Sequence, residues 1–274
     1  MTSLLSGSRL VPGAGSLGAL AVWLVIWLLP VGQALASCFP IAAAPGRVIP
    51  AAARPDAPAA GDVRLTYLGH SSFLIETSDG VTAVTDYNGY IRPAFIPDVV
   101  TMNNAHSTHY TPNPEPAITH VLRGWDPAGG VAHHDIVFRD LRVRNLPTNV
   151  RQIGGTRYNG NSIFIFEAED LCIAHLGHLH HRLTDQDLGA LGEIDVLLAP
   201  IDGAWTMAQG LMAEVVGQIR PAIVIPMHYT AGGLTERFAR LIAGRYETVY
   251  SDSPTLTVSR RNLPWGKMVV LPSS

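Results

Sequence analysis

Three short histidine-bearing segments constrain this chain more than any other feature of its sequence. They are Asn104–His109, His175–His181 and Pro226–Tyr229, and together they hold seven of the 11 histidines. Each segment follows an apolar run that predicts a β-strand. Imidazoles gathered at strand ends are how a fold assembles a metal site from distant parts of a chain. Because no Asp, Glu or Cys lies inside the segments, a metal bound there would have mostly neutral ligands.

Length and charge limit the classes of protein to which the chain can belong. Its 274 residues suit one domain of ordinary size with appendages. The net charge is −3 and charged residues make up only 15% of the chain, with no basic run. We therefore expect no nucleic-acid binding. The sequence leaves the oligomeric state open.

The N-terminus predicts export. Arg9 precedes an apolar stretch from Leu17 to Leu29, and Ala34–Ala36 offers a small-residue cleavage site. These features predict a signal peptide over residues 1–36 and a protein that is periplasmic, or membrane-anchored and facing the periplasm. The segment Leu35–Cys38 also resembles a bacterial lipobox. Lipidation of Cys38 and an uncleaved anchor therefore remain alternatives, and either would give a membrane tether.

The rest of the chain divides into a spacer and a folded domain. Residues 37–61 are rich in Ala and Pro, which is typical of a semi-extended linker. The folded domain is expected over residues 62–274. Its first part predicts strands, and its second part alternates helices with buried strands, which indicates an α/β fold with two sheets and outer helices. The expected helices are Thr184–Leu191, with Thr184 as N-cap, Thr206–Ile219 and Leu234–Ala243. The expected strands are Val63–Leu68, Ser72–Glu76, Val81–Thr85, Asp98–Met102, Ile118–Leu122, Asp135–Val143, Ser162–Glu167, Leu171–Ala174, Val196–Pro200, Ala222–Met227, Thr248–Tyr250, Leu256–Val258 and Met268–Leu271.

Five motifs in this domain match one known family. They are Tyr67–Glu76, Thr85-Asp86, His175–Thr184, Asp195–Pro200 and Ile225–Tyr229. With them the chain resembles the metallo-β-lactamase superfamily, in particular its lactonase-like and phosphodiesterase-like metal-dependent hydrolases. The resemblance runs from Val63 to Leu271 and implies a four-layer αββα sandwich. A fold alone does not determine the reaction.

The departures from the family pattern concern its metal-binding motifs. The main motif of the family is His-x-His-x-Asp-His, where this chain has Asn104 at the first His and Thr108 at the Asp, and keeps His106 and His109. The bridging Asp of the family is replaced by His178. A further family histidine, expected shortly before Ser162, is absent, and Thr148 or Asn149 falls near its place. His228 stands where the last ligand is expected.

The resemblance, taken residue by residue, implies a metal site built from His106, His109, His178 and His228. Three imidazoles with an open position form a known catalytic zinc arrangement, and His106 would be a fourth ligand or the general base. Two nearby divalent ions would need anionic ligands to offset their repulsion, and both family carboxylates are missing. We therefore expect one divalent metal, with zinc favoured and iron or copper as alternatives.

Other residues of the motifs are expected to support or line this site. Asp86 is expected to orient the histidine loop, and His70 to be an orienting hydrogen-bonder. Asn104 and Thr108 would border the pocket. For His175 and His181, a role in the pocket or in proton transfer and a purely structural role remain equally open. The same holds for Trp125 and Trp205, which would contact substrate or only pack at the rim.

The resemblance implies a metallo-hydrolase with a small-molecule substrate, and the N-terminal segment predicts that it is exported. A metal-bound hydroxide would attack an ester, lactone, amide or phosphodiester. A first alternative is a metal-binding protein without turnover, which the loss of the Asp at Thr108 and of the bridging Asp supports. A second alternative is a redox enzyme that uses iron or copper in the histidine-rich site. The sequence gives no Gly-x-Ser-x-Gly elbow and no phosphate-binding glycine loop.

Overall fold

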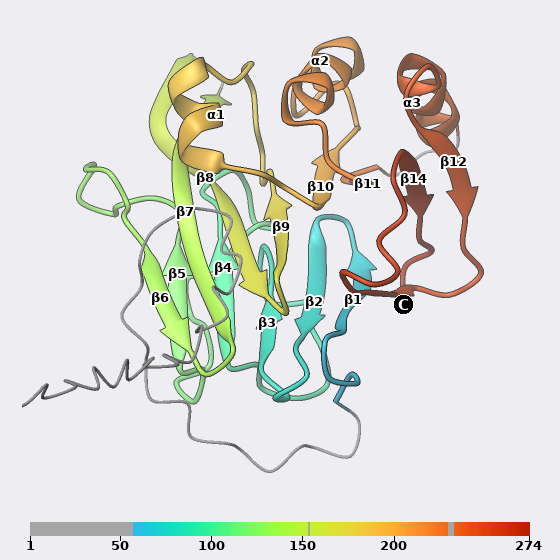
Figure 1. The fold of residues 1–274 in the computed structure, drawn as a ribbon. Coiled ribbons are helices and arrows are strands. Elements are labelled where there is room, and N and C mark those ends of the chain that lie inside the picture. Colours follow the sequence, from blue (N-terminus) through green and yellow to red (C-terminus); the bar gives the residue numbers. More distant parts are fainter. Residues whose placement is uncertain (1–56, 153, 230–232) are drawn as a thin grey trace, which may run out of the picture. The chain divides into compact units, whose positions relative to one another are not determined.

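A computed structural model describes residues 57–152, 154–229 and 233–274, and in them two β-sheets pack face to face (Figure 1). The first sheet has the strand order β13-β1-β2-β3-β4-β5, and the second has the order β12-β14-β11-β10-β9-β8-β7-β6. The strands are β1 Val63–Gly69, β2 Ser72–Glu76, β3 Thr82–Val84, β4 Val99–Met102, β5 His120–Arg123, β6 Asp135–Phe138, β7 Leu141–Gln152, β8 Gly155–Ala168, β9 Leu171–His175, β10 Val196–Pro200, β11 Ile223–Met227, β12 Glu247–Tyr250, β13 Thr255–Val258 and β14 Lys267–Val270. The helices are α1 Asp185–Leu191, α2 Gln209–Ile219 and α3 Leu234–Ile242. The predicted α/β class is confirmed, and the arrangement is consistent with the αββα sandwich.

The burial pattern along the strands explains the two layers. In β1 every second residue is buried, so Val63, Leu65 and Tyr67 face inward and the residues between them are less covered. The strands β10 and β11 are buried along their whole length and pair in parallel, as expected where both faces of a sheet are covered. The apolar side chains between the two sheets form the main core, which includes Phe73 and Phe164.

A second core lies between the second sheet and the three helices. It joins strand residues such as Ile165 and Val224 to helix residues such as Val215 and Phe238. On the outer face of the first sheet, a smaller apolar cluster around Tyr87 includes residues from loops. Helix α1 begins as predicted at Thr184, whose side chain accepts from the backbone of Asp187 while the Asp187 carboxylate accepts from Thr184 in return.

Several element boundaries differ from the prediction. The single strand expected over Asp135–Val143 is two strands, because a turn with left-handed backbone at Arg139 separates β6 from β7. The strand expected over Ser162–Glu167 is far longer, since β8 extends back to Gly155 in a hairpin with β7. A helix expected from Thr206 begins only at Gln209.

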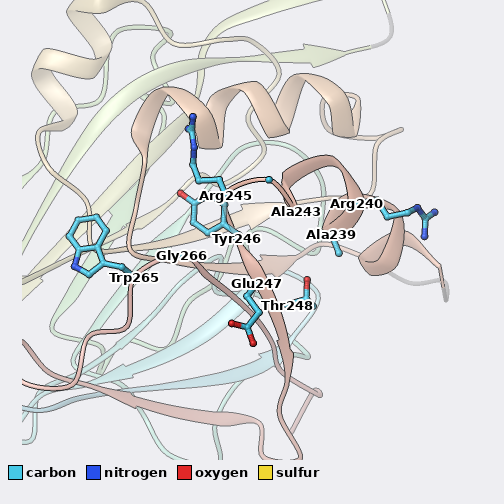
Figure 2. Close-up of a pocket in the computed structure, with 10 residues that line it drawn as sticks. Ala239, Arg240, Ala243, Arg245, Tyr246, Glu247, Thr248, Trp265 and Gly266 are labelled. Atoms are coloured by element: carbon cyan, nitrogen blue, oxygen red, sulfur yellow. The ribbon is translucent and has the colours of Figure 1, made fainter.

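The predicted signal peptide and Cys38 lie outside the described residues, as does most of the predicted linker. Within the described residues, no helix has the length and apolar character needed to cross a membrane. A cavity of about 580 Å³ lies beside α3, β12 and the start of β14 and is lined by Arg245, Tyr246 and Trp265, among others (Figure 2). Its lining contains no histidine, so it is separate from the predicted metal site.

Candidate metal centre

The ends of strands from the first sheet supply one half of the site. The turn between β1 and β2 carries His70, and the chain leaving β3 carries Asp86. The segment after β4 carries His106 and His109. The strands β3 and β4 are parallel, so their carboxyl ends lie at the same edge of the sheet. These residues therefore meet although up to 39 positions separate them along the chain.

The second sheet supplies the other half in the same way. Its parallel strands β9, β10 and β11 are followed by His178, Asp202 and His228, respectively. A crevice at the carboxyl ends of parallel strands is the usual place for a ligand site in α/β sheets. The two histidine-bearing halves thus face one another across the gap between the sheets.

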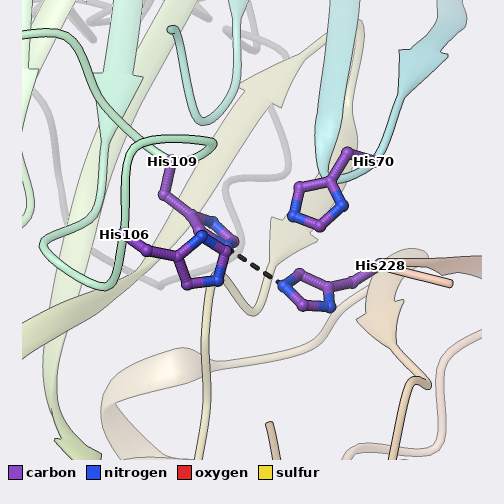
Figure 3. Close-up of side chains that lie close together, drawn as sticks. All are labelled: His70, His106, His109 and His228. Carbon is purple, nitrogen blue, oxygen red and sulfur yellow. Dashed lines mark hydrogen bonds between the residues drawn. The ribbon is translucent and has the colours of Figure 1, made fainter. Parts of the chain in front are cut away.

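Four imidazoles converge at this place. His70, His106, His109 and His228 each offer a ring nitrogen, and these nitrogens all lie within 4.8 Å of one another (Figure 3). His109 and His228 are buried, and the other two are half-buried. The set contains no carboxylate and no thiolate, as the sequence predicts for a metal bound here. Neutral imidazoles of this kind suit zinc and also copper, iron or nickel.

The facing nitrogens of His109 and His228 are 3.1 Å apart, between their Nε2 atoms (Figure 3). The Nδ1 atom of His109 lies 2.5 Å from a carboxylate oxygen of Asp86, and that of His228 lies 3.2 Å from one of Asp202. A carboxylate only accepts, so each Nδ1 carries a proton, and two rings without a second proton would turn the lone pairs of their Nε2 atoms toward one another. Two lone pairs at this distance repel unless a cation, either a proton or a metal ion, lies between them.

Further ring nitrogens near the cluster have no partner. The Nε2 atoms of His70 and His178 and the Nδ1 atom of His180 are buried and make no hydrogen bond within the described residues. A buried polar atom without a partner costs roughly 1–3 kcal/mol, so several in one place need an explanation. A metal ion in the cluster would account for the orphaned Nε2 atoms of His70 and His178, and the residues present fit such an ion.

The backbone at the site is unusual. His70, Asp86 and His228 all have positive φ values, of 52°, 44° and 57°. A residue with a Cβ atom rarely adopts this left-handed region, and such positions cluster at functional sites. The backbone N–H of His228 donates to the carbonyl of His70 over 2.6 Å, which ties the two halves of the site together.

Asp86 supports the first half, as the sequence predicts. It is fully buried and binds His109 Nδ1 through one oxygen and the Asn103 side-chain amide through the other, at 3.0 Å. Burial alone would raise the pKa of Asp86. The nearby charges of His109 and His175, with the hydrogen bonds from His109 and Asn103, outweigh burial and hold that pKa below its usual value.

Asp202 supports the second half, and the sequence analysis did not identify it. Its carboxylate faces His228 Nδ1 and also accepts from the loop that follows it, including the backbone of Ala204 and the hydroxyl of Thr206. Burial would raise the pKa of Asp202, but the hydrogen bonds from His228 and Thr206 hold it below its usual value. The available signal was its position just after a buried strand, which is also the position of Asp86.

His178 borders the cluster without joining the closest set of four. Its ring centroid lies 4.9 Å from that of His109 and 5.1 Å from that of His228. Its Nδ1 is 2.7 Å from Nε2 of His180, so one of the two nitrogens donates to the other. Burial, with the nearby histidines, keeps the pKa of His178 well below its usual value, so the ring stays neutral.

His70 makes no hydrogen bond through its ring within the described residues, where the sequence analysis expects an orienting hydrogen bond. Its backbone carbonyl does that work by accepting from Tyr67 and from His228. Burial, together with the nearby His228 and His109, lowers the pKa of His70 to about 3. The ring is therefore neutral and turned toward the other imidazoles, as a ligand would be.

Thr108 holds His106. The Thr108 hydroxyl lies 2.7 Å from His106 Nδ1, which leaves the Nε2 atom to face the cluster. Burial lowers the pKa of His106 to about 4, with His109 and His228 adding to the effect. The residue that stands in place of the family Asp thus orients a neighbouring imidazole.

Asn104 turns away from the metal site. With its amide oriented to satisfy its neighbours, its oxygen accepts from Arg157 over 2.8 and 2.9 Å and from the Trp125 indole over 3.3 Å. Trp125 is itself buried and packs against Tyr110. The position that bears the first family histidine therefore links the β4 loop to the β8 hairpin, and Trp125 has a packing role.

His175 and His181 use both ring nitrogens inside the protein. His175 donates from Nε2 to the Ser71 carbonyl and accepts at Nδ1 from the Gly177 backbone. His181 bonds the Arg182 carbonyl through Nδ1 and accepts from the Asn149 backbone at Nε2. This bonding favours the structural role among the two alternatives. Gly177 itself has φ of 58°, and a Cβ there would lie 2.4 Å from side-chain atoms of Asn103 and Asn161.

The predicted ligand set therefore stays a prediction, and His70 competes with His178 for the fourth position. The structure brings His106, His109 and His228 together as expected, and adds His70 to them in the place where His178 was expected. His178 remains adjacent, with an orphaned nitrogen. The difference arises because the turn after β1 brings His70 to the cluster. This turn depends on the left-handed backbone of His70, which the spacing of residues in a sequence does not predict.

Comparison with known sequences places the site in a context. The sequence profile of the family described as "Beta-lactamase superfamily domain" matches residues 64–228, which is more than half of the chain. A UPF0173 metal-dependent hydrolase of Pyrococcus horikoshii is 27% identical over 218 residues, which cover 68% of this chain and 95% of that protein. A UPF0173 metal-dependent hydrolase of Opitutus terrae is 27% identical over 195 residues, which cover 62% and 86%.

A solved structure shares the fold. It is that of a Thermotoga maritima protein assigned to the Zn-dependent hydrolases of the metallo-β-lactamase superfamily. The TM-score is 0.57 at 27% identity, and the match covers 77% of this chain and 100% of that chain.

Proposed function

The chain belongs to the family described as "Beta-lactamase superfamily domain", and from this premise we propose that it is a metal-dependent hydrolase. The substrate would be a small-molecule ester, lactone, amide or phosphodiester. When bound, a divalent ion would supply Lewis acidity at the electrophile and would favour ionisation of water near neutral pH.

The observation that carries this proposal is the pair of facing Nε2 atoms of His109 and His228, each fixed by a carboxylate on its far side. A carboxylate behind a metal-binding imidazole sets the tautomer and raises the basicity of the ligand. His106 and either His70 or His178 would complete a set of neutral ligands. Buried imidazoles that stay neutral are in the form that a metal needs.

We further propose that the site holds one ion. Both carboxylates near the cluster, Asp86 and Asp202, bind imidazole Nδ1 atoms and so act as supports behind the ligands. Without an anionic ligand between them, two divalent ions would repel one another strongly. Zinc fits a set of imidazoles best in a hydrolase, and iron or copper would suit the redox alternative.

The chain also offers a route for protons beside the cluster. His178 and His180 are joined by a hydrogen bond of 2.7 Å, and each has one buried nitrogen without a partner. Burial lowers the pKa of His180 to about 4, with Arg151 adding to the effect. If His70 completes the ligand set, His178 keeps a free Nε2 atom, and the pair could relay a proton between that atom and Nδ1 of His180, which is the task of a general acid–base group in hydrolysis.

Metal content tests the proposal directly. The protein is purified without chelator or histidine tag, and its metals are counted by mass-spectrometric elemental analysis. We expect about one zinc per chain and hydrolysis of a generic ester or phosphodiester, both lost in the double variant His109→Ala/His228→Ala. Two ions per chain would refute the single metal. Iron or copper would favour the redox enzyme, and metal without turnover would favour the non-catalytic metal-binding protein.

We propose, finally, that the protein is exported to the periplasm or held on its membrane by an N-terminal lipid or anchor. The support is the sequence of residues 1–38. Mass spectrometry of the mature protein tests this. Cleavage after Ala36 would indicate a signal peptidase product, and an N-terminal lipidated Cys38 would indicate a lipoprotein. An unprocessed N-terminus would indicate an anchor or no export.

A further inference from the structure

Two of the large apolar side chains that remain exposed are indoles of nearly equal exposure. Trp205 is 73% exposed and Trp265 is 74% exposed. Only Trp205 lies at the histidine cluster, with its ring centroid 6.4 Å from that of His106 at an angle of 64° between the ring planes. Trp265 lines the remote cavity beside α3 and β12 (Figure 2). Trp205 is therefore at the mouth of the candidate metal centre, and Trp265 is a matched control of equal exposure away from it.

The loop that carries Trp205 is fixed although its ring is exposed. The Asp202 carboxylate accepts from the backbone N–H groups of Ala204, Trp205 and Thr206. From the other side, the Arg151 guanidinium donates to the carbonyls of Ala204 and Thr206, each over 3.2 Å. Backbone bonds on both sides of Trp205 hold its main chain in place, so a ligand that stacks on the ring does not have to order the loop.

The same carboxylate that fixes this loop also orients His228, through the contact of 3.2 Å with Nδ1. The position of the indole and the direction of a candidate metal ligand are therefore set by one side chain. An apolar surface held in register with a polar, charge-bearing centre is the usual composition of a small-molecule site.

We propose that Trp205 is the platform on which the metal centre holds the planar, apolar part of its substrate. This inference rests on the proposed hydrolase function and deepens it. It selects, within the substrate classes above, molecules that carry an aromatic or other flat apolar group beside the scissile bond. An aromatic surface stacks on such groups and gains little from a compact polar substrate without one.

A binding experiment tests this without requiring turnover. The full-length, zinc-loaded protein is titrated with 1-naphthoate and with acetate, and both are followed by ligand-observed NMR. Both probes offer the same carboxylate to the metal, and only naphthoate offers a flat apolar group. We expect naphthoate to bind more tightly, and Trp205→Ala to weaken naphthoate binding roughly two- to tenfold while leaving acetate binding unchanged.

Two further variants make the test specific. Trp205→Phe keeps an aromatic ring and should restore part of the preference for naphthoate. Trp265→Ala removes an indole of equal exposure at the remote cavity and should change neither titration. Since Trp205 is exposed, its replacement should leave the thermal unfolding midpoint unchanged, which separates a binding effect from a folding defect.

The outcomes separate this inference from the proposed function. Equal affinity for the two probes, no effect of Trp205→Ala, or an equal loss in Trp265→Ala would overturn the role of Trp205. If the titrations behave as expected but the protein hydrolyses no ester, lactone, amide or phosphodiester that carries a flat apolar group, the platform stands and the hydrolase proposal fails. If turnover is found, Trp205→Ala should lower kcat/KM for an aryl ester more than for a small alkyl ester.

Discussion

The two carboxylate–histidine pairs of the candidate metal centre differ in burial and in the distance between their partners. In the first pair, Asp86 and His109 are both completely buried and lie 2.5 Å apart. In the second pair, Asp202 and His228 lie 3.2 Å apart and keep about 10% and 4% of their side chains exposed. The first pair comes from the first sheet and the second pair from the second sheet, and their Nε2 atoms meet in the middle.

The partners of each carboxylate show what this difference means. Asp86 is bound by Asn103, whose own oxygen accepts from the Ser162 backbone, so this pair is locked into the packed interior. Asp202 is bound by the amides of a surface loop that ends in an exposed indole. The first pair is therefore a rigid half of the site, and the second pair connects the site to the surface on which we propose that a substrate binds.

The largest expected difference between the halves is which sheet supplies the fourth metal ligand. His70 belongs to the first half and His178 to the second, and both have an orphaned Nε2 atom. Because His70 lies in the closest set of four, we expect His70→Ala to weaken zinc binding more than His178→Ala does. Loss of a ligand should cost at least the roughly 100-fold upper range seen for outer partners of metal ligands. Competition titration with a chelating dye measures both variants.

If His178→Ala proves the more damaging of the two, the set predicted from the sequence is right and the rigid half contributes only two ligands. Cobalt(II) spectra of the same variants report the geometry of the ligand field independently of affinity. A spectrum that changes in His178→Ala and not in His70→Ala would also contradict the assignment of His70.

The rigid half should be the less tolerant of a support mutation. Asp86→Asn removes a buried charge that faces His109, and leaves a fully buried site with the wrong hydrogen-bond donor. Losing the acceptor of a buried, charge-assisted hydrogen bond costs about 1–3 kcal/mol of stability, and zinc affinity should also fall about 10- to 100-fold. Urea unfolding of the metal-free protein measures the first effect, and chelator competition measures the second. Unchanged stability would show that the first pair is not the rigid element described here.

The same comparison shows what the sequence reveals and what it hides. Asp86 was predictable because a recognisable motif surrounds it, and the strand ends that bring His106, His109 and His228 together were predictable from apolar runs alone. Asp202 sits in the same kind of position but was missed, because its role depends on a loop that turns three backbone amides onto one carboxylate. His70 reaches the cluster because its own backbone is left-handed, and such a conformation leaves no periodic signal in a sequence.

The second half should respond more mildly to loss of its carboxylate. Asp202→Asn leaves a partly exposed site that water can reach, so we expect a smaller loss of stability than in Asp86→Asn. Zinc affinity should fall about tenfold, at the low end for such partners. Because the loop loses its anchor, naphthoate binding should also weaken, which Asp86→Asn at saturating zinc should not cause. Naphthoate titrations of the two zinc-loaded variants provide the check. Equal losses in both would remove the distinction between the halves.

A pH dependence of stability is expected from both halves. Burial lowers the pKa of His70 to about 3 and those of His106 and His180 to about 4, with other charges contributing, and the pKa of His178 is also lowered. In the unfolded chain these rings take up protons near pH 6.5, so between that pH and about 4 the unfolded state binds more protons. The metal-free protein should therefore lose stability progressively as the pH falls from about 6.5 toward 4. Below this range the lowered pKa values of Asp86 and Asp202 act in the same direction, since their unfolded forms protonate first.

Urea midpoints at a series of pH values in the presence of chelator measure the trend, and midpoints that stay constant between pH 7 and 5 would show that the imidazoles of neither half are held neutral. In His106→Gln, which removes one ring from the rigid half, the slope should be smaller, and in His120→Gln, which lies outside the cluster, it should match the unmodified protein.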